Sequence, residues 1–166
     1  MVPVDAGVST NDEILYATTT NEKSNLLSVE KFSSSENSGL FKLHSKSRVL
    51  LAADIDRMKG LCVSFKLKDQ GWGNRKGRVV IKVMNGSDEL LYQIEDWTVA
   101  SHEWDLIDEA YDEDHYPLKN LVEGCHFELW YSVGAGGGHE LYVENFNIDI
   151  MSIEGNKFYY AMIKIS

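Results

Sequence analysis

The sequence is poor in the residues that interrupt or cross-link a chain. Only 2 of its 166 residues are proline and only 2 are cysteine, whereas 43% are hydrophobic and 11% are aromatic. This composition argues against intrinsic disorder. A chain of this length buries roughly two-thirds of its unfolded surface. We therefore expect it to fold as one domain without metals or disulfides as staples.

Long hydrophobic runs are also missing. No run approaches the ~20 apolar residues that a membrane helix needs, and the opening stretch MVPVDAGVSTNDE lacks the basic and apolar segments of a secretion signal. We therefore expect a soluble protein of the reducing cytoplasm, with no membrane span. In that setting Cys62 and Cys125, each in an apolar strand-like run, are expected to be core thiols. A disulfide between neighbouring strands or a reactive thiol is the alternative.

Basic residues are scarce relative to acidic ones. The chain has 16 lysines and arginines against 26 aspartates and glutamates, which gives an acidic protein with a net charge of −10 at pH 7. Such a surface repels the phosphates of nucleic acids and of anionic membranes. The one dense basic run, from Asn74 to Arg78, is too short to reverse this balance. We expect no nucleic-acid partner.

What the sequence does contain is a succession of segments in which apolar and polar residues alternate. The clearest runs from Leu61 to Lys68, with period two, the period of a β-strand. The same alternation recurs from Arg78 to Met84. The dipeptide Asn85-Gly86, which accepts positive φ, then leads into a return strand that begins at Glu89. This is the strongest hairpin signal in the chain.

Further strands are expected on the same grounds. They lie at 14–20, 102–107, 126–133, 140–153 and 157–165. Residues 26–32 could form a helical turn or a strand, and 109–120 is expected to be an acidic connection. The alternation shifts by one residue near Glu144 and Asn145, which predicts a β-bulge. Many short strands with turn signals predict an all-β sandwich or barrel. We expect residues 49–166 to form its core and residues 1–48 to be a partly irregular segment that adds one or two strands.

The order of these elements resembles a known superfamily. An apolar strand leads into DQGWG, a hairpin follows, and a long loop ends at Pro117-Leu118; then come GCHFELWYSV, a glycine loop and the strand LYVENFNIDI. This order is similar to galactose-binding-like domains, which include carbohydrate-binding modules, discoidin-type domains and the sugar-binding domains of F-box proteins. The resemblance spans residues 39–152. It implies an antiparallel β-sandwich of jelly-roll type and a lectin-like binding module whose loops hold sugars at one end.

The loop from Asp69 to Arg75 has a composition suited to sugar recognition. An indole can stack on the apolar face of a pyranose, and polar side chains can bond its vicinal hydroxyls. The expected ligand-binding residues in this loop are Asp69, Gln70, Trp72, Asn74 and Arg75. The alternative is purely structural. The two glycines would permit a tight connection, Trp72 would cover the edge of the core, and Asp69 would pair with the cation at position 75 or 76.

A second loop, from Gly134 to His139, is rich in glycine. A strand rather than a helix follows it, which argues against phosphate binding. In a jelly roll this loop and the DQGWG loop would lie at the same end. His139 would then join Trp72 in one cleft as a further ligand-binding residue.

Signals for metals and catalysis are weak. Asp108, Asp112 and Asp114 are weak candidates for a structural calcium site, although an acidic solvated loop accounts for them as well. No HExxH, CxxC or nucleophile-elbow pattern is present. We therefore expect no enzyme activity and no cofactor, and a carbohydrate or glycoprotein as partner. Two alternatives stay open: a protein-interaction domain that docks a basic partner through its acidic surface and β-edges, and a hydrolase acting on polysaccharides.

Overall fold

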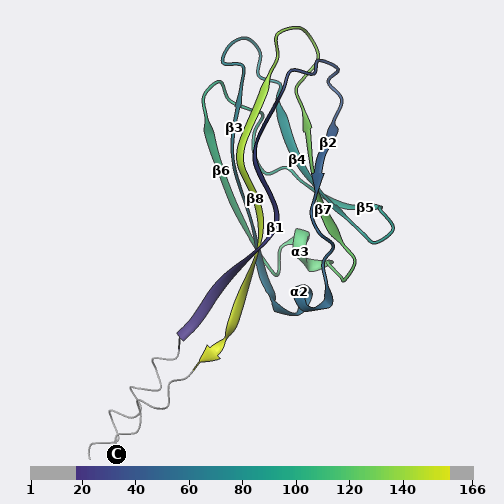
Figure 1. Cartoon of the computed structure of the whole chain (residues 1–166), viewed down its shortest axis with the longest axis vertical. Helices are drawn as coiled ribbons and strands as arrows, with labels where there is room; N and C mark the ends of the chain where they lie inside the picture. Colours follow the sequence, from purple (N-terminus) through teal and green to yellow (C-terminus); the bar gives the residue numbers. More distant parts are fainter. Residues whose placement is uncertain (1–17, 158–166) are drawn as a thin grey trace, which may run out of the picture.

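Two four-stranded antiparallel sheets make up most of the protein, which is seen here in a computed structural model that describes residues 18–157 (Figure 1). The first sheet contains, in spatial order, β1 (Thr18–Ser34), β8 (Leu141–Lys157), β3 (Met58–Asp69) and β6 (Asp105–Asp112). The second contains β2 (Lys42–Lys46), β7 (His126–Ser132), β4 (Arg78–Met84) and β5 (Leu90–Ile94). Two short helices, α2 (Ala52–Arg57) and α3 (Tyr116–Lys119), lie at the lower end in Figure 1.

The strand order is that of a jelly roll. The antiparallel pairs β1·β8, β2·β7, β3·β6 and β4·β5 run in this order from the ends of the chain toward its middle, and they alternate between the two sheets. The chain therefore folds as one long antiparallel ribbon wrapped into a sandwich. The expected fold class, an all-β antiparallel sandwich of jelly-roll type, is confirmed. β1 and β2, which precede residue 49, each belong to one of the sheets.

The core lies between the sheets and follows the predicted alternation. In β3, Leu61, Val63, Phe65 and Leu67 are at most 1% exposed, while the residues between them face outward. Each fully buried side chain of this size contributes roughly 1.5–3 kcal/mol through the hydrophobic effect. The ring of Phe65 meets that of Phe146 at 5.4 Å between centroids, which joins β3 to β8 at the centre of the core.

The predicted bulge in β8 is confirmed. The register against β3 shifts between Ser64 and Lys66, and Asn145 adopts a positive φ of 54°. The extra residue restores the core face, so that Val143 before the bulge and Phe146 after it are both fully buried. Without it, one of the two apolar sets would face solvent.

Other predicted elements differ from those in the structure or lie outside residues 18–157. Residues 26–32 are strand, within β1. The first four residues of the expected acidic connection belong instead to β6, because Tyr111 packs against the core and its hydroxyl donates to Asp96 at 2.6 Å. An edge strand tolerates the acidic residues that flank Tyr111. Residues 14–17 of one expected strand, and all but the first residue of the expected strand at 157–165, lie outside the described residues.

The two cysteines are both free thiols. Cys125 is fully buried, as expected of a core thiol. For Cys62 the expectation is wrong, because period two places it on the outward face of β3, where it is half-buried between Asp149 and Ala110 of the neighbouring strands.

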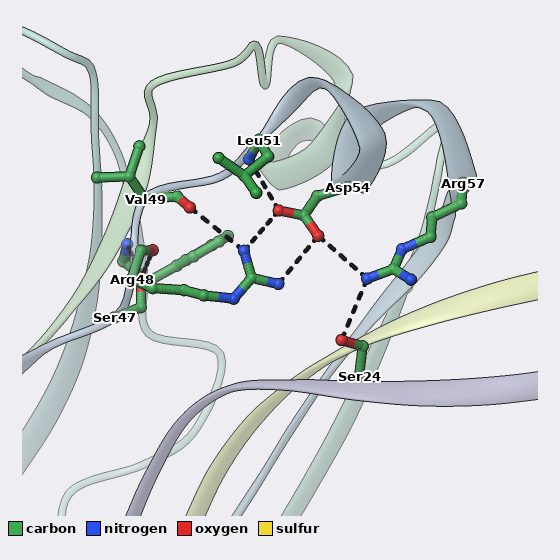
Figure 2. A network of polar contacts seen from close by, with 8 residues as sticks. Ser24, Ser47, Arg48, Val49, Leu51, Asp54 and Arg57 are labelled. Atoms are coloured by element: carbon green, nitrogen blue, oxygen red, sulfur yellow. Dashed lines mark hydrogen bonds and ion pairs between the residues drawn. The ribbon is translucent and has the colours of Figure 1, made fainter.

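A buried carboxylate organises the segment around α2 (Figure 2). Asp54 is 2% exposed and accepts two hydrogen bonds from the Arg48 guanidinium, at 2.6 and 2.9 Å. It also accepts from the Leu51 amide at 2.8 Å and from Arg57 at 3.1 Å, and Arg57 in turn donates to Ser24 of β1. The Arg48 hydrogen bonds are the main cause that holds the pKa of Asp54 well below its usual range, despite burial. One carboxylate thus joins the segment before α2, the helix itself and β1.

Replacing Asp54 with asparagine tests this network. Asp54→Asn is expected to lower the free energy of unfolding by about 2–3 kcal/mol at neutral pH, since it removes a buried charge hydrogen-bonded to two arginines. The exposed neighbour Asp56 offers the matched control Asp56→Asn. Urea denaturation of the three proteins measures the difference, and equal stability of the two variants would contradict the assigned role.

The difference in stability between the wild type and Asp54→Asn should also depend on pH, in a direction that the pKa of Asp54 sets. The folded state depresses the pKa of Asp54 below its unfolded value of about 3.9. The ionised carboxylate therefore contributes stability above that value, and the contribution is lost as the pH falls below it. The gap in stability between the wild type and Asp54→Asn should accordingly narrow in acid.

Candidate functional site

Four connections gather at one end of the sandwich (Figure 1). Successive antiparallel strands reverse direction, so the links β1–β2, β3–β4, β5–β6 and β7–β8 all lie at the end opposite α2 and α3. A bridge between Ser38 and Ala135 joins the first of these loops to the last. The topology thus brings the DQGWG loop and the glycine loop to the same end.

Asp69 is an internal anchor of this end. Its side chain has no exposed surface, and it accepts hydrogen bonds from the Gly71 amide at 2.7 Å and from Nδ1 of His102 at 2.8 Å. Its own amide donates to the carbonyl of Ser101. The carboxylate therefore joins the β3–β4 loop to the β5–β6 loop, and its partner is a histidine rather than the cation at position 75 or 76.

Arg75 and Gln70 complete the support of the loop. The Arg75 guanidinium donates to the carbonyls of Ala100 at 2.9 Å and Val99 at 2.8 Å. Gln70 donates to carbonyls of its own loop, and its side-chain oxygen accepts from the Glu140 amide at 3.1 Å. These side chains use their polar atoms to fix backbone. Asn74 is exposed at the surface of the loop.

Trp72 is the exposed feature that this support presents. Its side chain is 61% exposed and does not belong to the core. The six-membered part of its indole lies against Gly138, where a Cβ would come within 2.7 Å of Cη2. The structure therefore places Trp72 beside the glycine loop as an open apolar surface, and not as a cover over the edge of the core.

His139 follows Gly138 in the glycine loop and is mostly buried. It is 9% exposed, and its Nδ1 is buried with no hydrogen-bond partner among the residues that the structure describes. Its Nε2 is directed toward Gly136 of the same loop. His139 thus lies within the glycine loop, and Trp72 supplies the accessible surface.

The carboxylates proposed for calcium do not converge. Asp112 accepts from the Asp114 amide at 3.0 Å and pairs with Nδ1 of His115 at 2.7 Å, while Asp108 lies further back on β6. Within residues 18–157 no group of three His, Cys, Asp or Glu side chains is close enough to hold a metal ion. In that same range, no helix has the length and apolar character to span a membrane.

The buried carboxylate of the second sheet, Glu128, is also fully engaged. It is 4% exposed and accepts from Nε2 of His126 at 2.8 Å and from the Trp130 indole at 2.9 Å. Burial by itself raises the pKa of Glu128. These hydrogen bonds and the charge of Lys46, 3.7 Å away, outweigh burial and hold the pKa below its usual value. A carboxylate held ionised and enclosed in this way supports the sheet.

A groove that is not predicted from the sequence lies on the outer face of the first sheet. Its volume is about 450 Å³, and it is lined by Lys31, Phe32, Ser33, Trp104, Tyr142, Val143 and Glu144. The sequence contains part of the signal for this groove, because its alternation places Tyr142 and Glu144 at outward positions of a predicted strand. The pairing that assembles them with residues of β1 is long-range, and no local pattern shows it.

Comparisons with known proteins place few constraints on this chain. No family model matches the sequence, and no curated protein sequence has significant similarity to it. Among solved structures, a CBM4 carbohydrate-binding module has a TM-score of 0.36 and 12% identity over 83% of this chain and 78% of its own. An arabinose-bound α-L-arabinofuranosidase has a TM-score of 0.33 and 13% identity over 80% of this chain, which spans 19% of that enzyme.

The contact between Trp72 and Gly138 leads to a test that needs no ligand. Gly138→Ala places a methyl group against the indole at a φ of +81°, so it should cost about 1–3 kcal/mol of stability and displace the ring. Gly137 has open space around its Cα, so Gly137→Ala should change stability by less than about 0.5 kcal/mol. Urea denaturation and near-ultraviolet circular dichroism measure both effects. Equal behaviour of the two variants would contradict the contact.

Proposed function

We propose that this protein is a non-catalytic carbohydrate-binding module that takes a sugar on the exposed face of Trp72. The observation that carries the proposal is an indole that is 61% exposed and yet held in place by the loops around it. When a ligand covers a large apolar ring, the ring's surface is removed from water, and this makes the free energy of binding more favourable. The apolar face of a pyranose suits a flat aromatic ring.

Rigid support under the ring favours binding. Three side chains of the loop that carries Trp72 fix its position. The buried Asp69 accepts from the Gly71 amide, Arg75 donates to the β5–β6 loop, and Gln70 accepts from the Glu140 amide. A ligand that meets a preformed surface does not have to order it, so less of the binding free energy is lost to entropy. The roles of Asp69, Gln70 and Arg75 in this proposal are therefore to position Trp72.

Polar contacts to the sugar come from the rim of the surface. Asn74 is exposed in the same loop and can donate to and accept from hydroxyl groups. The nearest carboxylate in sequence, Asp69, is enclosed by Gly71 and His102 and cannot reach a ligand. The proposed mechanism is accordingly recognition without a chemical step, and a weak single site gains strength if several copies act together.

The Trp72→Ala variant tests the proposal. A glycan array identifies a ligand, and calorimetric titration then compares the variant with wild type. Loss of one covered aromatic ring should weaken binding by about 10- to 100-fold, equivalent to roughly 1.5–3 kcal/mol. Leu90 is an exposed apolar residue at the opposite end of the sandwich, so Leu90→Ala serves as control. An unchanged affinity of Trp72→Ala for every detected glycan would exclude this site.

A further inference from the structure

The groove on the outer face of the first sheet combines aromatic rings with ammonium groups. Strand register places Ser33, Tyr142 and Lys68 side by side across β1, β8 and β3. Trp104 flanks this row from the segment that leads into β6, and the Lys68 Nζ lies 5.0 Å from the centre of its ring. The same ammonium lies 5.4 Å from the centre of the Tyr142 ring. Lys68 is thus held between two aromatic faces.

The next row of the sheet adds further cations. Lys31, Glu144 and Lys66 lie side by side across the same three strands, and the Lys66 Nζ is 5.8 Å from the Trp104 ring. None of the three lysines of this face forms an ion pair within 4 Å with any residue in the described part of the chain. This face therefore carries three lysines and one glutamate in a protein whose net charge is −10: Lys31 lines the groove itself, and Lys66 and Lys68 lie beside its Trp104 ring.

We propose that this groove is a second binding site, for a saccharide that carries a carboxylate, that is, one containing a hexuronate residue. Trp104 and Tyr142 provide apolar ring surface for a sugar beside the Lys68 ammonium, and Trp104 is 39% exposed. Ser33 and Glu144 line the same groove and can bond hydroxyl groups. Lys31 and Lys68 supply charge-assisted hydrogen bonds to the carboxylate, which are stronger than those between neutral groups.

The size and surroundings of the groove favour an oligosaccharide with few charges. A volume of about 450 Å³ is in the range of small-molecule sites. Tyr142 also lines a smaller cavity of about 140 Å³ with Glu140 and Ser33–Ser35, which extends the polar surface along the strands. The net charge of −10 opposes a continuous polyanion such as a nucleic acid. A single uronate within a sugar chain meets the local cations without that opposition.

Two disaccharides that differ in one group test the inference. Cellobiouronic acid and cellobiose are titrated against the full chain, with inorganic phosphate as an anion that lacks a sugar. We expect cellobiouronic acid to bind about tenfold or more tightly than cellobiose, and binding of the acid to weaken as salt screens the lysines. Equal binding of the two disaccharides would overturn the role of charge. Binding of phosphate but of neither disaccharide would overturn the assignment of a saccharide as the ligand.

Variants separate this site from the Trp72 surface. Lys68→Gln and Trp104→Ala should each weaken binding of cellobiouronic acid by about tenfold. Lys59→Gln is the matched control on the same strand, because Lys59 pairs with Glu113 away from the groove. If glycan binding depends on Trp72 but not on Lys68 or Trp104, the proposed function stands and this inference fails. Unfolding curves confirm that each variant is folded.

Discussion

The alignment of β8 between β1 and β3 is the constraint on which the rest of the structure depends. β8 pairs along most of its length with both neighbours, and its inward side chains Phe146, Ile148 and Ile150 are fully buried. Because side chains of a strand alternate between faces, a slip of one residue would turn this set outward. The bulge at Asn145 keeps the apolar residues on both sides of it inward, and so leaves Tyr142 on the outer face, where the groove forms.

Buried carboxylates act in the same way at the two ends of the sandwich. Asp54 joins α2 to the preceding segment and to β1, and Asp69 joins two loops at the opposite end. In each case the charge is stabilised because donors surround it, and the backbone that carries those donors becomes fixed. A loop held by a buried charge can expose an apolar ring such as Trp72, whose own packing contributes little to holding it in place.

Much of the fold could be predicted from the sequence because strand alternation is a local property. The pattern from Leu61 to Lys68, the hairpin turn at Asn85 and the bulge near Asn145 all read directly as β-structure, and the order of elements indicated the jelly roll. The extension of β6 through its acidic residues could not be read in this way. The one buried side chain among residues 109–112, Tyr111, bonds to a partner, Asp96, that is supplied by a different loop.

The candidate site was less accessible to prediction, because its chemistry depends on residues far apart in the chain. Composition singled out the loop from Asp69 to Arg75, but only pairing with His102 shows that Asp69 is enclosed.

The placement of β1 and β8 has a mechanical consequence. Thr18 and Lys157 lie opposite each other, at the far end from Trp72 (Figure 1). Tension applied between these two residues would peel β1 from β8 one hydrogen bond at a time, starting at the end remote from the loops. The first bonds to yield would therefore be distant from the Trp72 surface, which would keep its shape while the other end opens.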